Sequence, residues 1–299
     1  MKNALTIDVE DYFHATAFSA NDESLNGNTY VSRVEQNTEK ILEILAEKGC
    51  PATFFVVGSV AERFPQLIQQ IVRAGHEIAC HSFAHCQVFN LTRNQFYEDT
   101  RRAKLAIENA AGVPVYGYRA PSFSITKASP WAFELLVELG FRYDSSIFPV
   151  KHINFKMQYV PRHPFVIITS AGSILEFPMT TLQIFGTRAP LAGGAYLRLL
   201  PYWYTRWGIR YLNASESRPA CVYLHPWELD PAQPRMKSGL SARMRHYFGL
   251  RRAEIKFRRL LMDFEFQPLG LLVKNLSNQL SQRIPQIRDR ELLLGMEDP

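Results

Sequence analysis

The sequence predicts an α/β fold with a mainly parallel sheet, of a size that suits a single α/β barrel. Three observations predict this fold class. The chain has 299 residues, of which 46% are hydrophobic and 21% charged, as in an ordinary globular protein. Short apolar runs typical of buried strands alternate with segments of helical periodicity. Chemically reactive side chains follow several of these runs, and the carboxyl ends of parallel strands share one site.

The first half of the chain shows this alternation most regularly. Continuous apolar runs predict buried strands at 4–9, 52–57, 76–80, 115–118 and 141–143. Apolar residues at helical spacing predict helices at 34–48, about 60–75, 92–111 and 129–140. Thr92 and Gln95 have the spacing of a capping box, and a glycine ends the helices at 34–48, about 60–75 and 129–140. This order favours a parallel sheet with helical crossovers.

The second half of the chain is less regular. We expect strands at 174–177 and 220–224, a basic helical segment at about 241–263, and a last strand at 266–273. Residues 275–299 are charged and weakly patterned, which predicts a flexible tail. The pattern therefore indicates one domain over 1–274, with a distinct C-terminal part from about 150 to 274.

The net charge is positive but is not tied to one obvious motif. The formal charge is +6 and the isoelectric point about 9.1, with basic residues concentrated at 243–246 and 251–252. This balance favours anionic partners. A solvated basic face explains it better than nucleic-acid binding, so we expect no nucleic-acid partner.

The four cysteines predict free thiols rather than a disulfide framework. They are scattered, contain no Cys-x-x-Cys and suit a reducing compartment. Cys80 and Cys86 flank a histidine pair and are either additional metal ligands or ordinary thiols. The first apolar run is too short for a signal peptide, and no later run reaches the length of a membrane helix. We therefore expect no transmembrane segment and a cytoplasmic location.

Two histidines and an acidic pair are candidate metal ligands. His81 and His85 follow the strand at 76–80, and neutral imidazole is the commonest protein ligand of zinc. Asp8 and Glu10 close the first strand two residues apart, so their side chains share a face. One carboxylate and two histidines leave a fourth zinc position open, and the second carboxylate can accept a proton from water. Taken singly, the histidine pair is more typical of surface or core residues, and the acidic pair is more typical of a solvated surface.

Three further polar side chains follow other predicted strands. Arg119 can hold a nearby carboxylate ionised and oriented, or it can form a purely structural ion pair. His225 has aromatic and acidic neighbours, which is unusual for a plain core residue. Asp144 can orient His225 and raise its pKa, as a general acid requires.

Five motifs, taken in order, resemble those of the polysaccharide deacetylases, the NodB-homology group or carbohydrate esterase family 4. They are Thr-Ile-Asp-Val-Glu at 6–10, His-Ser-Phe-Ala-His at 81–85, Arg-Ala-Pro-Ser at 119–122, Asp-Ser-Ser at 144–146 and Leu-His at 224–225. No single motif is specific, but the combination is. Two longer stretches resemble the exosortase-associated subfamily of exopolysaccharide loci: Asp-Val-Glu-Asp-Tyr-Phe at 8–13 and Tyr-Leu-His-Pro-Trp-Glu at 223–228.

The resemblance implies a distorted (β/α) barrel and metal-assisted hydrolysis of an N-acetyl group, with zinc or a similar divalent ion as cofactor. Asp8 matches the general base of this family, and Arg119 matches the residue that braces it. His81 and His85 match metal ligands. His225 matches the general acid that protonates the leaving amine.

The resemblance also implies substrate-binding residues. The backbone N–H of Ser122 would help to hold the oxyanion, an interaction typically worth a few kcal/mol. Serine replaces the family's tyrosine there, which a backbone donor tolerates. Leu224 would line the pocket for the acetyl methyl group, and we place Trp227 with the substrate-binding residues.

The acidic metal ligand departs from the common family pattern. Val9 occupies the position of the usual second aspartate, so Glu10 is favoured instead, as in the peptidoglycan-deacetylase and allantoinase-like branch. Asp11 remains the alternative ligand, because a bulge at the strand end would turn it inward.

We therefore expect a metal-dependent N-deacetylase that acts on an N-acetylated carbohydrate, in a polysaccharide or its precursor. One alternative is another C–N hydrolase on the same fold, acting on a small cyclic amide or ureide. The other is a non-catalytic sugar-binding protein, which the presence of Asp8 and His225 disfavours.

Overall fold

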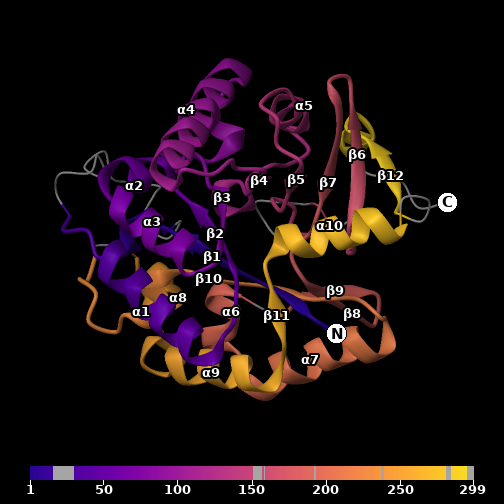
Figure 1. Cartoon of the computed structure of the whole chain (residues 1–299). Helices are drawn as coiled ribbons and strands as arrows, with labels where there is room; N and C mark the ends of the chain where they lie inside the picture. The colour runs from indigo at the N-terminus through magenta and orange to yellow at the C-terminus, as the bar shows by residue number, and fades with distance from the viewer. Residues whose placement is uncertain are drawn as a thin grey trace.

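A ten-stranded, mostly parallel sheet runs through the molecule (Figure 1). The computed structural model describes residues 1–15, 30–150, 157, 159–191, 193–236, 239–280 and 284–294. The strand order is β10–β1–β2–β3–β4–β5–β7–β6–β12, and β11 pairs with the start of β1. The strands are β1 (Asn3–Val9), β2 (Thr53–Val56), β3 (Glu77–Cys80), β4 (Gly117–Tyr118), β5 (Tyr143–Asp144), β6 (Phe165–Thr169), β7 (Gly172–Glu176), β10 (Cys221–Leu224), β11 (Phe266–Gln267) and β12 (Gln286–Arg288).

Parallel pairing brings the carboxyl ends of several strands to the same edge of the sheet. Every residue of β1, β2 and β10 is buried, as expected for strands with both faces covered. In register, Asp8 lies beside Phe55 of β2, and Cys80 at the end of β3 lies beside Tyr118 of β4. The segments that follow β1, β3, β4 and β10 therefore emerge together, and they carry the candidate site.

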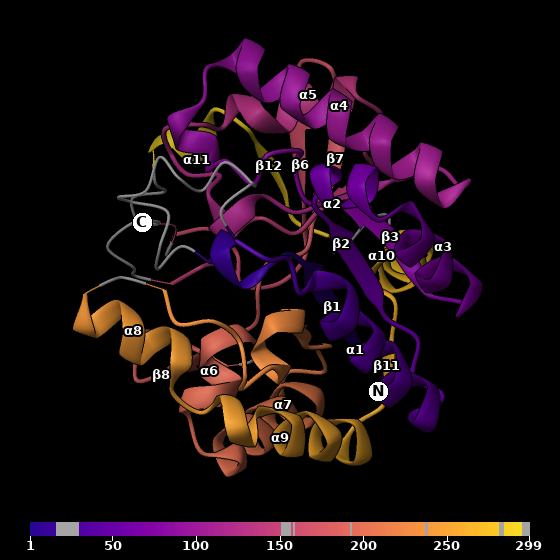
Figure 2. The same cartoon turned by 90° about the vertical axis from the view of Figure 1, so that its left-hand side faces the viewer.

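Helices surround the sheet. Figures 1 and 2 show α4 and α5 along the upper edge of the molecule and α7 and α9 along its lower edge, with the sheet between them. The helices are α1 (Val34–Lys48), α2 (Gly58–Arg63), α3 (Pro65–Arg73), α4 (Arg93–Ala111), α5 (Trp131–Glu138), α6 (Gly194–Leu199), α7 (Tyr202–Ser215), α8 (Leu240–Tyr247), α9 (Leu250–Asp263), α10 (Leu269–Leu280) and α11 (Glu291–Leu294).

Local signals set the helix ends in the first half of the chain. Thr92 caps α4, accepting a hydrogen bond from the backbone N–H of Gln95, and the reciprocal bond completes the predicted capping box. Gly49 ends α1 in the left-handed conformation, with φ of 57°. The single helix expected over 60–75 is wrong: Pro65 begins a second helix, because proline suits a first turn but not a helix interior.

The second half departs further from the expected pattern. The strand expected at 266–273 is wrong in length: only Phe266–Gln267 form a strand, β11, and helix α10 begins at Leu269. A short apolar run fits either type of element. β6 and β7 pair antiparallel, and a separate hairpin consists of β8 (Thr181–Ile184) and β9 (Thr187–Pro190).

The last residues of the chain contain regular structure. The segment at 275–299, expected as a flexible tail, holds the end of α10, strand β12 and helix α11 among its described residues. β12 pairs with β6 in parallel, with Ile287 opposite Ile167. Strand β12 therefore belongs to the sheet, and helices flank it along the chain.

The predicted fold class is confirmed: a parallel-dominated sheet with helices around it, consistent with a distorted barrel. Within the described residues, no helix combines the length and apolar character needed to cross a membrane.

Candidate active site and metal centre

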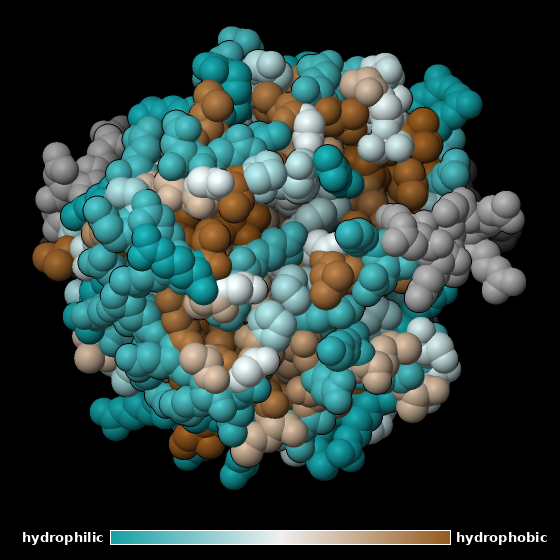
Figure 3. All heavy atoms as spheres, viewed as in Figure 1, coloured by the Kyte–Doolittle hydropathy of each residue, from teal (hydrophilic) through white to brown (hydrophobic). Residues whose placement is uncertain are grey.

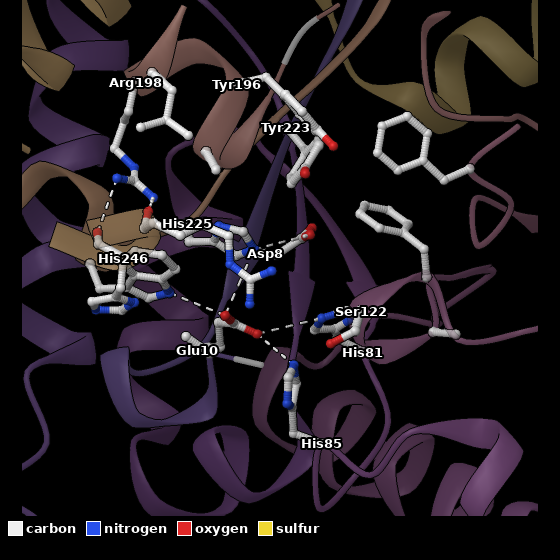
Figure 4. A pocket seen from close by; sticks show the side chains of 18 residues that line it. Asp8, Glu10, His81, His85, Ser122, Tyr196, Arg198, Tyr223, His225 and His246 are labelled. Atoms are coloured by element: carbon white, nitrogen blue, oxygen red, sulfur yellow. Dashed lines mark hydrogen bonds and ion pairs between the residues drawn. The ribbon is translucent and has the colours of Figure 1, made fainter. Parts of the chain in front are cut away.

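Three predicted ligands converge beyond the ends of β1 and β3 (Figure 4). One ligand atom each from Glu10, His81 and His85 lies within 4.8 Å of the other two. Oε2 of Glu10 is 2.5 Å from Nε2 of His85 and 3.8 Å from Nε2 of His81. One carboxylate and two imidazoles form a donor set that suits a divalent ion such as zinc.

The surroundings of these ligands fit a cation. Nδ1 of His81 lies 2.7 Å from the carbonyl oxygen of Arg119, so Nδ1–H donates there and Nε2 keeps a lone pair for the centre. Nε2 of His85 is buried and has no hydrogen-bond partner among the described residues, although it faces Glu10. Trp227 donates from Nε1 to Oε1 of Glu10 at 3.1 Å. A metal ion between Glu10 and His85 would satisfy both groups.

Charge keeps Glu10 ionised. Burial raises the pKa of its carboxyl, but the charges of His85 and His225 outweigh burial and hold that pKa well below its usual value. The neighbouring Asp11 turns elsewhere: its carboxylate accepts hydrogen bonds from the hydroxyl of Ser32 and from the backbone N–H of Arg33. The structure therefore places Glu10, rather than Asp11, with the histidines.

Asp8 is held by a fully buried arginine. Nη1 of Arg119 donates to Oδ1 of Asp8 at 2.7 Å and lies 2.8 Å from the hydroxyl of Thr6. The same guanidinium donates to the backbone oxygen and hydroxyl of Ser145, and it lies over the ring of Phe55. These contacts fix one oxygen of Asp8 and leave Oδ2 facing His225 at 3.9 Å.

His225 lies across the cavity from the arginine, and a carboxylate that the sequence analysis missed orients it. Nδ1 of His225 is 2.5 Å from Oε1 of Glu228, and Oε2 of Glu228 accepts from Nε of Arg198 at 2.7 Å. Burial lowers the pKa of His225, but the charges of Glu10 and Glu228 outweigh it and raise the pKa to about 9. Arg198 is only 2% exposed and also donates to backbone oxygens at the end of α8. The backbone at the end of α8 therefore holds Arg198, which in turn holds Glu228 and His225 in place.

The prediction that Asp144 orients His225 is wrong. Asp144 is fully buried and accepts hydrogen bonds from the backbone N–H and hydroxyl of Ser146. Its neighbour on the adjacent strand β7 is Glu176. Burial and the charge of Asp144 raise the pKa of Glu176 well above its usual value. Asp144 therefore holds the loop after β5 in place. Glu228, and not Asp144, contacts His225.

A cavity of about 270 Å³ opens onto these residues. Asp8, Glu10, both ligand histidines and His225 line it, as do the predicted substrate-binding residues Ser122 and Trp227. Leu224 is not among the described lining residues. In register with Ile7 of β1, it packs in the hydrophobic core, and the adjacent Tyr223 faces the cavity instead. The prediction for Leu224 is therefore corrected, since side chains alternate between the two faces of a strand.

Aromatic side chains form much of the remaining wall. Tyr223 and Phe123 pack edge to face at 5.1 Å between ring centres, and Phe148 and Tyr196 extend this wall. On the other side, the ring of Trp227 stacks between those of His225 and His246, at 5.0 Å and 4.4 Å. Such a wall offers apolar faces to a sugar ring or an acetyl group.

The two loops that follow β3 and β4 are strained. Ser82, His85, Ser122 and Phe123 have φ between 54° and 61°, the left-handed region that non-glycine residues rarely adopt. Strain of this kind persists where the surroundings impose it and is concentrated at functional sites. Here it turns His85 toward Glu10 and puts Ser122 on the cavity wall (Figure 4).

Local signals could have revealed only part of what the sequence analysis missed. Glu228 lies three residues after His225, and the two form a capping box around the short 3₁₀ turn at Pro226–Leu229. Arg198 and Tyr196 lie on α6, far from every motif, and no spacing pattern connects them to His225. Among the cysteines, Cys80 and Cys221 are buried thiols, and none belongs to the metal cluster found among the described residues.

The fold and the site together define a class: α/β proteins that gather a Glu-His-His centre, an arginine-bound carboxylate and a histidine at the carboxyl ends of parallel strands. Two family models match the chain. Residues 23–143 match "Polysaccharide deacetylase", and residues 145–274 match "Domain of unknown function (DUF3473)". Residues 23–143 therefore carry a polysaccharide deacetylase domain, the family that the motifs of the sequence resemble.

Curated relatives have corresponding names. The chain is 29% identical to a peptidoglycan deacetylase of Helicobacter pylori over 126 residues, 42% of this chain and 41% of that protein. It is 40% identical to a chitooligosaccharide deacetylase of Sinorhizobium fredii over 73 residues, 24% of this chain and 34% of that protein. The chain thus spans less than half the length of these curated relatives.

Solved structures share the fold over nearly the whole chain. A structure from Mycobacterium smegmatis, assigned to the polysaccharide deacetylases, matches with a TM-score of 0.61 at 21% identity, covering 96% of this chain and 94% of that one. Another from Pseudomonas aeruginosa, with a similar assignment, matches with a TM-score of 0.59 at 16% identity, covering 93% and 91%. At these identities the likeness shows the fold alone.

Proposed function

We propose that this protein is a metal-dependent hydrolase that removes N-acetyl groups from amino sugars of a polysaccharide or its precursor. One observation carries the proposal: a Glu-His-His cluster lies between an arginine-bound carboxylate and an oriented histidine in one cavity. Amide hydrolysis requires an activated water, a stabilised oxyanion and a protonated leaving amine. The residues of this cavity can supply each of them.

Glu10, His81 and His85 would hold the metal ion, most simply Zn²⁺. The buried Nε2 of His85, which faces the ionised Glu10, supports a cation there. A divalent ion bound by this set supplies Lewis acidity for attack on the acetyl carbonyl. Zinc tolerates such a mixed nitrogen and oxygen set with an open position.

Asp8 acts as the general base in this proposal. Arg119 binds its Oδ1, and the free Oδ2 faces the cavity beside the metal cluster. The guanidinium orients the carboxylate, so Asp8 can take a proton from water as the water attacks the amide carbon. The backbone N–H of Ser122, on the cavity wall, would donate to the oxygen that becomes negative.

His225 acts as the general acid. Its raised pKa of about 9 keeps the imidazole protonated at neutral pH, and Nε2 points toward Asp8 and Glu10. Glu228 and Arg198 are positioning residues, because they touch His225 or its partner rather than the reacting atoms. The proton on Nε2 can pass to the amine nitrogen as the carbon–nitrogen bond breaks.

The cavity suits an N-acetylated sugar. Tyr223, Phe123 and Tyr196 offer aromatic faces, while the catalytic groups form the polar side. The names of the curated relatives add support, since both are deacetylases of acetylated glycans by name. We extend the proposal to exopolysaccharide biosynthesis on the motifs at 8–13 and 223–228. The four free cysteines favour the cytoplasm as its location.

Acetate release and metal content test the proposal together. Purified protein should release acetate from N-acetylated oligosaccharides, lose this activity on chelation and regain it with Zn²⁺. The Asp8→Asn protein, prepared in parallel, controls for contaminating deacetylases. Hydrolysis of a cyclic amide or ureide, without acetate release from any glycan, would support the alternative function as another C–N hydrolase. Absence of both activities in the metal-loaded protein would contradict an enzymatic function.

A further inference from the structure

The positive charge of the chain is concentrated in three helices of the C-terminal part. Helices α7, α8 and α9 contain nine arginine and lysine residues and two acidic ones. The rest of the chain has 25 basic and 26 acidic side chains and is therefore nearly neutral. The net charge of +6 is thus a property of this one region.

Charged and apolar side chains alternate on the outer face of α9. Arg252, Ile255, Arg259 and Met262 are exposed and recur three or four residues apart, so they form one stripe along the helix. Ile255 is 55% and Met262 64% exposed, which is unusual for large apolar residues. The opposite face of α9 packs in the core through Phe257 and other apolar residues.

The stripe continues onto neighbouring elements. One groove, of about 880 Å³, is lined by Phe248, Arg251, Arg252, Ile255 and Arg259. A second hollow is lined by Arg259, Met262 and Trp203 of α7, so the two adjoin. We call Phe248, Arg251, Arg252, Ile255, Arg259 and Met262 the basic face. Figure 3 shows brown and tan side chains among teal ones along the lower edge of the molecule, over α7 and α9.

The arginines of the basic face are not neutralised by carboxylates. In this region, ion pairs of the described residues join Arg206 to Asp263 and Arg258 to Glu47 and Glu254. No carboxylate of the described residues pairs with Arg251, Arg252 or Arg259. The basic face therefore presents uncompensated positive charge beside exposed apolar groups.

We propose that the basic face docks on an anionic lipid bilayer. Arginines attract anionic headgroups, while Phe248, Ile255 and Met262 can enter the acyl boundary, as in interfacial amphipathic helices. Trp203, 67% exposed beside Met262, is of the type enriched at membrane interfaces. Exposed aliphatic groups would gain little from a nucleic acid, which binds through phosphate contacts and aromatic stacking. The combination therefore favours a lipid surface.

Docking on this face would bring the active-site cavity close to the bilayer. Arg198 and Leu199 line both the cavity and the groove of the basic face. Arg245, at the end of α8, also lines the cavity. The cavity would thus lie close to the lipid surface. The docking itself does not depend on the proposed activity.

Vesicle binding by the full chain tests this inference. Unmodified protein should bind vesicles of phosphatidylcholine with 30% phosphatidylglycerol and not vesicles of phosphatidylcholine alone. One basic residue near an anionic surface contributes roughly fivefold to binding, so Arg251, Arg252 and Arg259 replaced by Gln should weaken it roughly a hundredfold. A matched variant, with exposed Arg73, Arg101 and Arg142 of the first half replaced by Gln, has the same net charge and should bind normally.

An apolar variant separates a bilayer from a simple anion surface. Replacement of Phe248, Ile255 and Met262 by Gln keeps every charge and should weaken vesicle binding at least about tenfold. Brominated lipids should quench the fluorescence of unmodified protein, and Trp203→Phe should remove most of that quenching. Vesicle binding and bromine quenching of the unmodified protein test the inference even where a variant fails to fold.

Three results would overturn the inference. The first is no binding of unmodified protein to the anionic vesicles. The second is unchanged binding by the apolar variant, which would indicate an electrostatic surface alone. The third is tighter binding to a 20-base-pair DNA duplex than to vesicles, with the apolar variant unaffected, which would assign the face to nucleic acid.

Discussion

The two halves of the chain contribute different parts of the candidate site. The regular half, β1 to β5, contributes Asp8, Glu10, His81, His85 and Arg119 from strand ends. The irregular half contributes His225, its partners Glu228 and Arg198, and the wall residues Tyr196 and Tyr223. The proposed base and metal ligands thus come from repeated β–α units, and the proposed acid and its support come from the C-terminal part.

The largest effect is expected when the proposed general base, Asp8 of the regular half, is removed. Asp8→Asn should lower turnover about 10²–10⁴-fold, because losing a positioned general base typically costs that much. Bound metal should stay nearly constant, since Asp8 is not in the ligand cluster. Acetate release and metal content per chain measure both. Because Arg119 loses its buried partner, a thermal unfolding scan must show that the variant is folded. Turnover close to that of the unmodified protein would remove Asp8 from the mechanism.

The next effect separates the two candidate acidic ligands. Glu10→Gln should lower metal occupancy sharply, because the amide cannot carry the charge that holds the ion. Asp11→Asn is the matched control and should keep its metal, since Asp11 binds Ser32 and Arg33 instead. Elemental analysis of both proteins decides the matter. A metal-poor Asp11 variant beside a metal-replete Glu10 variant would reverse the assignment.

A smaller effect tests the support that the irregular half provides. Glu228→Gln should lower turnover by about tenfold or more and move the alkaline limb of the pH–rate profile to lower pH. The sign follows from the raised pKa of His225: without the charge of Glu228 that pKa falls, and the protonated acid is lost at a lower pH. The full pH dependence of kcat/KM measures this shift.

Asp144→Asn is the control for that shift. Asp144 binds Ser146 and has no contact with His225 among the described residues, so its variant should keep the alkaline limb in place. If Asp144→Asn moves the limb and Glu228→Gln does not, the orienting carboxylate belongs to the regular half after all.

The smallest effect compares local helix signals in the two halves. Thr92→Ala removes the cap of α4 and should lower the free energy of unfolding by about 1 kcal/mol. Ser241→Ala in α8 is the control, because Ser241 is exposed and caps nothing, and its effect should stay within about 0.5 kcal/mol. Chemical denaturation of both variants measures the difference. Equal losses would mean that the capping box adds little to the regular half.

Prediction from sequence succeeded where a single element contains the signal. The apolar run at 4–9 and the acidic residues after it predict both β1 and the place of Asp8 and Glu10. The four-residue spacing of His81 and His85 likewise lies within one loop, and the capping box of α4 within one turn. It failed for the run at 266–273, because the same apolar residues satisfy a strand or a helix until neighbours decide.

The sequence by itself determined the fold class, most strand ends and the residue types of the site, because backbone periodicity acts over a few residues. Only the tertiary structure decided which carboxylate orients His225. Arg198 of α6 holds Glu228 against His225, while Asp144 is drawn to Ser146 and β7. Register with β1 decided that Tyr223 rather than Leu224 faces the cavity. Local spacing brings Glu228 near His225, but contacts between distant segments settle these choices.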